Sequence, residues 1–91
     1  MQPESGHIEL SVIIPTYNEE GNIEIMAKSI KDTMQVLPYD YELIFVDDGS
    51  KDKTFQMVNE HFGSHPQVKV FCKENGGKAS ALNYGISKAT A

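Results

Sequence analysis

The chain has 91 residues and a formal net charge of −5, with 40% hydrophobic and 23% charged residues. This length allows at most one small domain, and the composition is that of a globular protein rather than a disordered one. The acidic balance argues against binding to nucleic acid or to an anionic membrane surface, because both require clustered Lys and Arg. No apolar stretch approaches the roughly 20 residues of a membrane span, and the N-terminus lacks the features of a signal peptide.

Residues 1–9 read as a polar lead-in, and residues 10–91 carry an alternating strand and helix pattern. Apolar runs of strand length, rich in Val, Ile and Phe, occupy residues 10–14, 42–46 and 68–72. Each run is followed by apolar residues at helical spacing. The order β-α-β-α-β-α predicts an α/β, Rossmann-like fold with a three-stranded parallel sheet. The single cysteine, Cys72, lies in the third run, which predicts a small core residue in a reducing compartment.

Three apolar stripes at helical spacing define the predicted helices. They comprise Ile23, Met26, Ala27, Ile30, Met34 and Leu37 in the first helix, Phe55, Val58 and Phe62 in the second, and Ala79, Leu82, Ile86 and Ala89 in the third. Asn18 is the predicted cap of the first helix, and Ser50 or Asp52 that of the second, because Asn, Ser and Asp side chains accept hydrogen bonds from exposed helix N–H groups.

The carboxyl ends of parallel strands share one edge of the sheet, where α/β proteins bind ligands. Residues 15–22, 47–53 and 73–78 follow the three predicted strands and are rich in Gly, Asn, Asp, Pro and Ser. The connections at the opposite edge, residues 37–41 and 63–67, have no comparable cluster of acids and amides. This asymmetry predicts a functional site rather than a set of turns.

The first of these loops offers an aromatic ring and a carboxylate. Tyr17 could stack on a base and Glu19 could accept a hydrogen bond, or Tyr17 could simply pack while Glu19 favours the helix dipole. In the second loop, Asp47 and Asp48 follow a buried strand. An ionised carboxylate only accepts hydrogen bonds, so Asp47 could recognise the imide N–H of uracil. The alternative is an ordinary turn, since Asp-Gly is a common loop pair.

The third loop pairs Gly76 and Gly77 with Lys78 at the start of a predicted helix. Paired glycines let backbone N–H groups approach an anion, and a helix N-terminus favours negative charge. A cation in the first helical turn opposes the helix dipole, and a bound phosphate would reverse that penalty. The alternative is a solvated lysine beside a glycine hinge. The spacing matches neither a P-loop nor a dinucleotide fingerprint.

Three blocks together carry a resemblance to a known family. They read SVIIPTYNEE over residues 11–20, YELIFVDDGS over residues 41–50 and NGGKASALNYG over residues 75–85. In this order and at these spacings they resemble the GT-A fold glycosyltransferases of family 2. The resemblance covers residues 10–91 and implies that the chain is the N-terminal, nucleotide-sugar-binding part of a GT-A fold.

The resemblance implies an inverting transferase that uses a nucleotide-diphosphate sugar, usually a UDP-sugar, and passes the sugar to a hydroxyl or a polyprenyl phosphate. Asp47 matches a residue that contacts the base, Lys78 matches one near the phosphates, and Asp48 matches a second acid that either contacts the nucleotide or orders the loop. The positions that match the lining of the nucleoside pocket are Pro15, Thr16, Tyr17 and Glu19.

Family members also carry an Asp-x-Asp motif that binds Mg²⁺ or Mn²⁺ and a later catalytic base, and both would lie beyond residue 91. A diphosphate leaving group needs its charge neutralised, and base assistance needs a residue near the acceptor. We therefore predict no metal ligands and no catalytic residues in this chain, and no turnover by it alone. The resemblance implies a parent protein in the cytoplasm or at the cytoplasmic face of a membrane.

Two other classes of function compete with an enzyme fragment. A non-catalytic module that binds a uridine nucleotide would share Asp47 and Lys78. A structural domain with three ordinary turns would have no nucleotide affinity. Because a three-stranded sheet leaves its edges open, self-association through an exposed edge is a further prediction.

Overall fold

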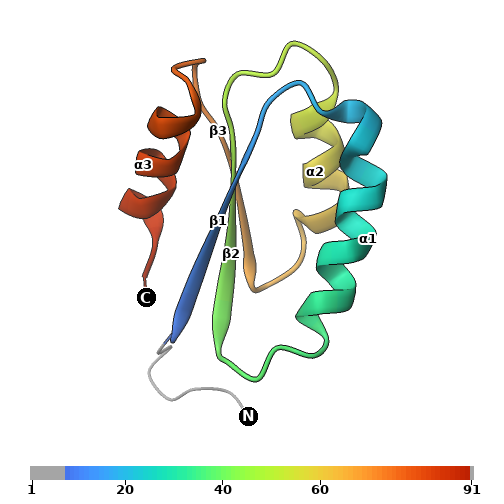
Figure 1. Ribbon diagram of the computed structural model, residues 1–91, viewed down its shortest axis with the longest axis vertical. Coiled ribbons are helices and arrows are strands. Elements are labelled where there is room, and N and C mark those ends of the chain that lie inside the picture. Colours follow the sequence, from blue (N-terminus) through green and yellow to red (C-terminus); the bar gives the residue numbers. More distant parts are fainter. Residues whose placement is uncertain (1–7, 91) are drawn as a thin grey trace.

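The computed structural model describes residues 8–90, so the predicted lead-in, residues 1–9, lies almost entirely outside the described part (Figure 1). The elements follow in the order β1 (Leu10–Thr16), η2 (Glu20–Asn22, a single 3₁₀ turn), α1 (Ile23–Met34), β2 (Tyr41–Asp47), α2 (Thr54–Phe62), β3 (Val68–Cys72) and α3 (Lys78–Lys88). The predicted alternation of strands and helices is confirmed.

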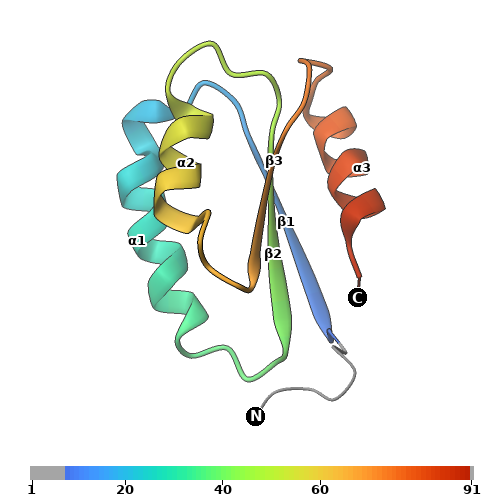
Figure 2. The same ribbon diagram turned by 180° about the vertical axis from the view of Figure 1, so that it is seen from behind.

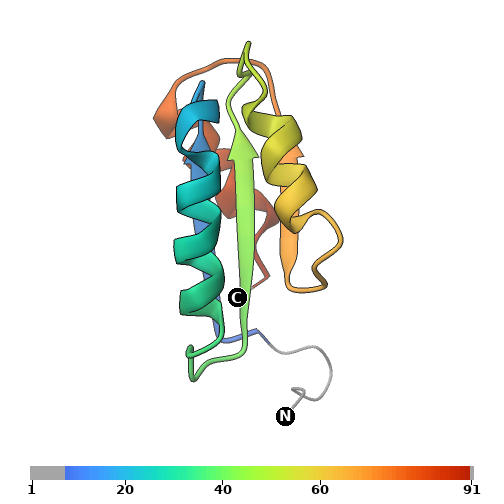
Figure 3. The same ribbon diagram turned by 90° about the vertical axis from the view of Figure 1, so that its right-hand side faces the viewer.

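The three strands form one parallel sheet in the order β1-β2-β3, with β2 in the centre (Figure 3). Leu10 pairs with Tyr41 at one end of β1 and Thr16 with Asp47 at the other, while Asp47 also pairs with Cys72 on β3. All three strands therefore end at the same edge, as predicted. Every residue of β2 is buried, as expected for a strand that has neighbours on both sides and helices on both faces.

Helices cover the two faces of the sheet unequally. Figures 1 and 2 show α1 and α2 side by side on one face and α3 alone on the other. The larger core lies beneath α1 and α2, where Phe45 of β2 stacks on Phe62 of α2 with 4.8 Å between ring centroids. The smaller core lies beneath α3 around Ile44, Val46 and Ala81. Odd-numbered residues of β2 thus face α1 and α2, and even-numbered residues face α3.

The first strand runs two residues further than predicted, through Pro15 to Thr16. Proline has no N–H to donate to a neighbouring strand, so within sheets it belongs on an edge. Among the described residues β1 pairs with β2 alone, which makes it an edge strand. The extension carries Thr16 to the end of the sheet, beside Asp47.

The predicted stripe of the third helix is wrong. Ile86 is 60% exposed, whereas the residues of α3 that are buried against the sheet are Ala81 and Gly85. A Cβ atom on Gly85 would lie 2.5 Å from Cγ2 of Ile13, so only glycine allows α3 to lie this close to β1. Small residues rather than large aliphatic ones make this contact. No helix within residues 8–90 combines the length and the apolar character that a membrane crossing requires.

Candidate functional site

The loops that follow the three strands surround a cavity of about 400 Å³. Its lining comes from all three loops and comprises Pro15, Thr16, Tyr17, Glu19, Asp48, Asn75, Gly77 and Lys78. Six of the seven residues predicted for the nucleotide site are among them. The seventh, Asp47, is not. The parallel sheet thus brings together residues that are up to 63 positions apart in the chain.

The two neighbouring acids point to opposite faces of the sheet because successive side chains of a strand alternate. Asp47 is an odd-numbered residue and faces the α1 and α2 side, whereas Asp48 faces the loop before α3 and binds Gly76 and Gly77. The same alternation at the end of β3 directs Cys72 to Asp47 and Lys73 to Asp48. The acid pair therefore divides into two separate environments, and only Asp48 reaches the cavity.

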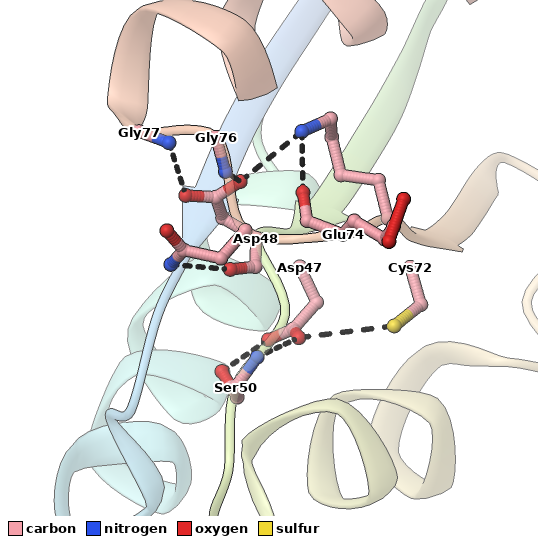
Figure 4. Close-up of polar contacts among 9 residues, drawn as sticks. Asp47, Asp48, Ser50, Cys72, Glu74, Gly76 and Gly77 are labelled. Atoms are coloured by element: carbon pink, nitrogen blue, oxygen red, sulfur yellow. Dashed lines mark hydrogen bonds and ion pairs between the residues drawn. The ribbon is translucent and has the colours of Figure 1, made fainter.

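Asp47 is 2% exposed and holds the second loop together (Figure 4). Its Oδ1 accepts hydrogen bonds from the Thr16 hydroxyl at 3.0 Å and the Ser50 hydroxyl at 2.6 Å. Its Oδ2 accepts from the Ser50 backbone N–H at 2.8 Å and makes a weak contact with the Cys72 thiol at 4.0 Å. A carboxylate has about four acceptor positions, so the described residues already occupy those of Asp47.

The thiol of Cys72 lies at the end of β3 rather than in the core as predicted, and the residue is exposed. Partial burial of the sulfur atom, and then the negative charge of Asp47, raise the pKa of this thiol. Both effects disfavour the thiolate. Cys72 is therefore a weak donor to Asp47 and not an activated nucleophile.

Asp48 is 4% exposed and binds the third loop (Figure 4). Its Oδ1 accepts from the Gly76 N–H at 2.9 Å and pairs with Lys73 Nζ at 3.3 Å, and its Oδ2 accepts from the Gly77 N–H at 2.8 Å. The Gly76 hydrogen bond lowers the pKa of Asp48 most; burial opposes it, and Gly77 and Lys73 lower the pKa further. Among the bonds between described residues, Oδ2 retains one acceptor position for a ligand.

The glycine N–H groups predicted to meet an external anion thus already bind an internal one. Asn75 reinforces this contact, because its side-chain amide donates to the Asp48 carbonyl at 3.1 Å. The backbone of Asn75 lies so close that a Cβ atom on Gly49 would be 2.7 Å from its nitrogen. Gly49 also has φ +73°, a conformation that favours glycine. The second and third loops therefore form one clamped unit.

The first and second loops are joined by side chains that bind backbone groups. Asn18 has φ 49°, its N–H donates to Ser50 Oγ at 2.8 Å, and its Oδ1 accepts from the Lys51 N–H at 2.8 Å. The prediction that Asn18 caps the first helix is wrong, since Asn22 occupies that position. Its side chain binds the second loop instead.

The prediction that Ser50 or Asp52 caps the second helix is wrong, since Lys53 occupies that position and no side chain caps it. Asp52 still accepts from the N–H of Thr54, the first helical residue, at 2.9 Å. The Thr54 hydroxyl also donates to Asp52 and lowers the pKa of its carboxyl most, against the opposing effect of burial. Ser50 does not bind this helix. It binds Asp47 and Asn18.

Three of the lining residues with an aromatic or charged side chain remain accessible to solvent: Tyr17, which is 44% exposed, Glu19, which is half-buried, and Lys78, which is exposed. Glu19 accepts from the N–H of Tyr17 at 3.1 Å, which ties its carboxylate to the loop that carries the ring. The cavity thus combines an exposed aromatic face, the Asp48 carboxylate and the Lys78 ammonium group. An aromatic ring, a hydrogen-bond acceptor and a cation suit the base and the phosphates of a nucleotide.

Sequence reasoning missed Asn75 and Lys73 as site residues, and it expected the N–H of Gly77 to meet an external anion rather than Asp48. Asn75 lies with Lys78 in the third block, so the block itself could have indicated it. Lys73 lies one residue past the end of β3, and only the parallel register with β2 reveals its position beside Asp48.

A divalent metal would need several oxygen, nitrogen or sulfur ligands that converge on one point. Within residues 8–90, no group of three or more His, Cys, Asp or Glu side chains could hold a metal ion. The carboxylates of Asp47 and Asp48 instead bind internal donors. The described residues therefore do not fit a metal site by themselves.

Comparison with known proteins agrees with the fold. Residues 11–91 match the family model described as glycosyl transferase family 2. The chain is 42% identical over 83 residues to an uncharacterized glycosyltransferase of Synechocystis. This match covers 90% of the chain and 26% of that relative. The chain is also 33% identical over 84 residues to a bactoprenol glucosyl transferase of Shigella phage SfV, and this match covers 27% of the length of that relative.

A solved structure has the same fold over most of this chain. It is a mannosyltransferase of Pyrobaculum calidifontis in complex with GDP-Man and Mn²⁺, with a TM-score of 0.67 and 32% sequence identity. The alignment covers 94% of this chain and 26% of the mannosyltransferase. The chain thus spans about a quarter of the length of the relatives it matches. With its parallel α/β fold and a family match over residues 11–91, the chain belongs to glycosyltransferase family 2.

Proposed function

We propose that the chain is the donor-binding part of an inverting glycosyltransferase and that it holds a nucleotide-diphosphate sugar in the cavity at the carboxyl edge of the sheet. The observation that carries this proposal is the convergence of Tyr17, Asp48 and Lys78 on one cavity from three separate loops. Ordinary turns would not require an aromatic ring, a buried carboxylate and a cation at one point. The family match and the nucleotide-sugar complex of the mannosyltransferase support the same reading.

Each side chain has a role that follows from its chemistry. The ring of Tyr17 stacks on the base, the Asp48 carboxylate accepts a hydrogen bond from the base edge, and the Lys78 ammonium group pairs with the diphosphate. Pro15 and Thr16 form the wall between the first and second loops. The base contact is thus assigned to Asp48, because Asp47 is saturated by internal donors and lies outside the cavity lining.

A carboxylate selects bases that present an N–H donor at their edge. Uracil offers an imide N–H, and guanine offers N–H groups at the corresponding edge, whereas adenine and cytosine present a ring acceptor there. We propose a UDP-sugar as the donor. A GDP-sugar is the competing possibility, since GDP-Man is the donor in the structure of the mannosyltransferase.

The whole protein is proposed to transfer the sugar to a hydroxyl or a polyprenyl phosphate. The bactoprenol glucosyl transferases among the relatives favour a polyprenyl acceptor. The site of action proposed for the whole protein is the cytoplasm or the cytoplasmic face of a membrane. Mg²⁺ or Mn²⁺ would supply charge neutralisation at the diphosphate, through ligands outside the described residues. We expect the 91 residues alone to show no transfer, and measurable turnover by this chain would contradict that expectation.

The test is a calorimetric titration of the 91-residue chain with UDP, GDP, ADP and CDP, each with and without Mn²⁺. We expect saturable binding of UDP, weaker binding of GDP, and binding of ADP and CDP at least about tenfold weaker. Asp48→Ala should abolish the preference among bases. Absence of saturable binding by all four nucleotides would overturn the proposal for this chain.

A non-catalytic module that binds a uridine nucleotide would use the same cavity. Turnover of a UDP-sugar by the full-length protein decides between the two, because only the enzyme releases UDP in step with glycosylated acceptor.

Self-association through a sheet edge remains a prediction. Among the described residues β1 has no strand partner on its outer side, and an apolar groove of about 260 Å³ lies beside it between β1 and α1. Its lining includes Leu10, Val12, Ile30 and Leu37. A second copy could cover this groove by pairing with β1. Light scattering at working concentration tests this, and a monomeric mass would contradict it.

A further inference from the structure

Lys73 lies directly behind the proposed base-binding carboxylate. It follows the last residue of β3, and its Nζ lies 3.3 Å from Asp48 Oδ1. The Lys73 side chain is 17% exposed and that of Asp48 is 6% exposed, so this ion pair is largely shielded from water. Lys73 is not among the residues that line the cavity.

Both ends of Lys73 are held in place. Its backbone N–H donates to the Asp47 carbonyl at 2.9 Å, which continues the pairing of β3 with β2. Its Nζ donates to the Glu74 carbonyl at 2.6 Å as well as to Asp48. A lysine fixed at its backbone and at its ammonium group presents its charge at one point, unlike a solvated lysine.

We propose, on the basis of the function proposed above, that Lys73 is a positioning residue that keeps the Asp48 carboxylate ionised and turned toward the base. Lys73 and the Gly76 N–H occupy Oδ1. Oδ2 accepts one bond from Gly77 and keeps an acceptor position for the ligand. In this arrangement Oδ1 binds only protein groups, whereas Oδ2 binds both Gly77 and the nucleotide.

The electrostatics of the loop support this role. A nearly buried carboxylate is costly unless donors or a cation balance it. The Gly76 hydrogen bond lowers the pKa of Asp48 most, burial raises it, and Gly77 and Lys73 lower it further. Removal of Lys73 leaves Asp48 easier to protonate. A protonated Asp48 would offer an O–H donor and lose selectivity for a base that donates.

The chain supplies a matched control on the same strand. Lys69 of β3 pairs with Glu42 of β2 at 3.1 Å, at the opposite end of the sheet. Lys69→Met and Lys73→Met each remove one positive charge and one lysine–carboxylate pair. They have the same effect on net charge, and they differ in position relative to the cavity and in exposure, since the Lys69 side chain is 43% exposed and that of Lys73 17%.

The test measures binding of a neutral nucleoside and its diphosphate to wild type, Lys73→Met, Lys73→Arg and Lys69→Met between pH 3 and 8. The pair used is uridine with UDP, or guanosine with GDP, whichever wild type binds more tightly. We expect Lys73→Met to weaken both ligands by the same factor, about tenfold. The loss of affinity on acidification should begin at a higher pH than in wild type. Lys73→Arg should restore most of the affinity, and Lys69→Met should match wild type.

Each outcome decides the matter. If wild type binds neither ligand, the proposed function fails and this role fails with it. If wild type binds and Lys73→Met behaves like Lys69→Met in both affinity and pH profile, the function stands and the role of Lys73 is refuted. If Lys73→Met weakens the diphosphate but not the nucleoside, Lys73 contacts phosphate and the positioning role is also refuted.

Discussion

A buried carboxylate lies at each end of β2, Glu42 within the strand and Asp48 directly after it. Each pairs with a lysine in β3 or directly after it, yet the two carboxylates differ in what surrounds them. At the amino end, Glu42 is 4% exposed and pairs with Lys69. It also accepts from the Ser11 hydroxyl at 2.6 Å and from the N–H and hydroxyl of Thr90 at 2.7 and 2.9 Å. At the carboxyl end, Asp48 pairs with Lys73 but also lines a cavity.

The partners of Glu42 come from β1, from β3 and from the residues after α3, so this carboxylate joins elements of the fold. The partners of Asp48 come from a glycine loop, and one of its oxygens keeps room for a ligand. A buried, ion-paired carboxylate is therefore not by itself a sign of a binding site. Its position relative to the carboxyl edge of the sheet, and the presence of a cavity, separate a structural acid from a functional one.

The largest expected effect is at the amino end. Glu42→Ala should destabilise the fold by about 3 kcal/mol, because it removes the buried carboxylate that Ser11, Lys69 and Thr90 share. Urea unfolding at pH 7 measures this. Under conditions where the variant is folded, its nucleotide affinity should equal that of wild type. A loss of affinity as large as that of an Asp48 variant would remove the distinction between the two ends.

Lowering the pH should also reduce the stability of the fold through Glu42, at the amino end of β2. Burial alone would raise the pKa of Glu42, but the hydrogen bonds from Ser11 and Thr90 and the Lys69 contact outweigh it and lower the pKa from 4.5 to about 2. A depressed pKa gives stability that is present above the unfolded value and is lost as pH falls from about 4.5 toward 2. At pH 3 this loss is about 2 kcal/mol. The matched variant is Glu42→Gln, whose stability relative to wild type should rise by that amount between pH 6 and pH 3; parallel curves would contradict the assignment.

The neighbouring acids Asp47 and Asp48 allow the same comparison of a structural and a functional carboxylate within one dipeptide. Asp48→Asn should weaken UDP binding roughly tenfold, about 1.4 kcal/mol, since the cavity loses its charged acceptor. Asp47→Asn should mainly lower the free energy of unfolding, because Asp47 binds only internal groups. Titration and urea unfolding of both variants provide the check. The opposite pattern, with affinity lost only in Asp47→Asn, would return the base contact to Asp47.

The smallest effect is expected at Lys78. Lys78→Met should weaken UDP about fivefold, near 1 kcal/mol, and leave uridine binding unchanged, because the ammonium group meets only the phosphates. The measurement compares UDP with uridine on the same variant. Equal losses for both ligands would place Lys78 at the nucleoside instead.

The sequence was sufficient for the parts of the fold that depend on repeating patterns. The three strands, the order of the elements and the shared carboxyl edge all follow from apolar periodicity, and six of the seven predicted site residues meet at one cavity. The failures have tertiary causes. Asn18 binds the second loop rather than a helix, and α3 packs through Ala81 and Gly85, which no count of large apolar residues would select.

The sequence motif also could not predict that Asp47 and Asp48 lie in separate environments. Alternation along β2 could have indicated that neighbouring acids face opposite sides, but not which side holds the cavity. That depends on the crossing of α3 to the face opposite α1 and α2, which places Gly76 and Gly77 beside Asp48 (Figures 1 and 4). The role of Lys73 depends on the same crossing.

The most direct test of the central claim is an amide NMR titration of the ¹⁵N-labelled 91-residue chain with UDP. We expect saturable changes in amide chemical shift, with one common dissociation constant, at Tyr17, Glu19, Asp48, Gly77 and Lys78. We expect no comparable shifts at Ser11, Glu42, Lys69 and Thr90, which surround the other carboxylate. Saturable shifts centred on Glu42, or no saturable shifts at any residue, would contradict the assignment of the nucleotide site to the carboxyl edge.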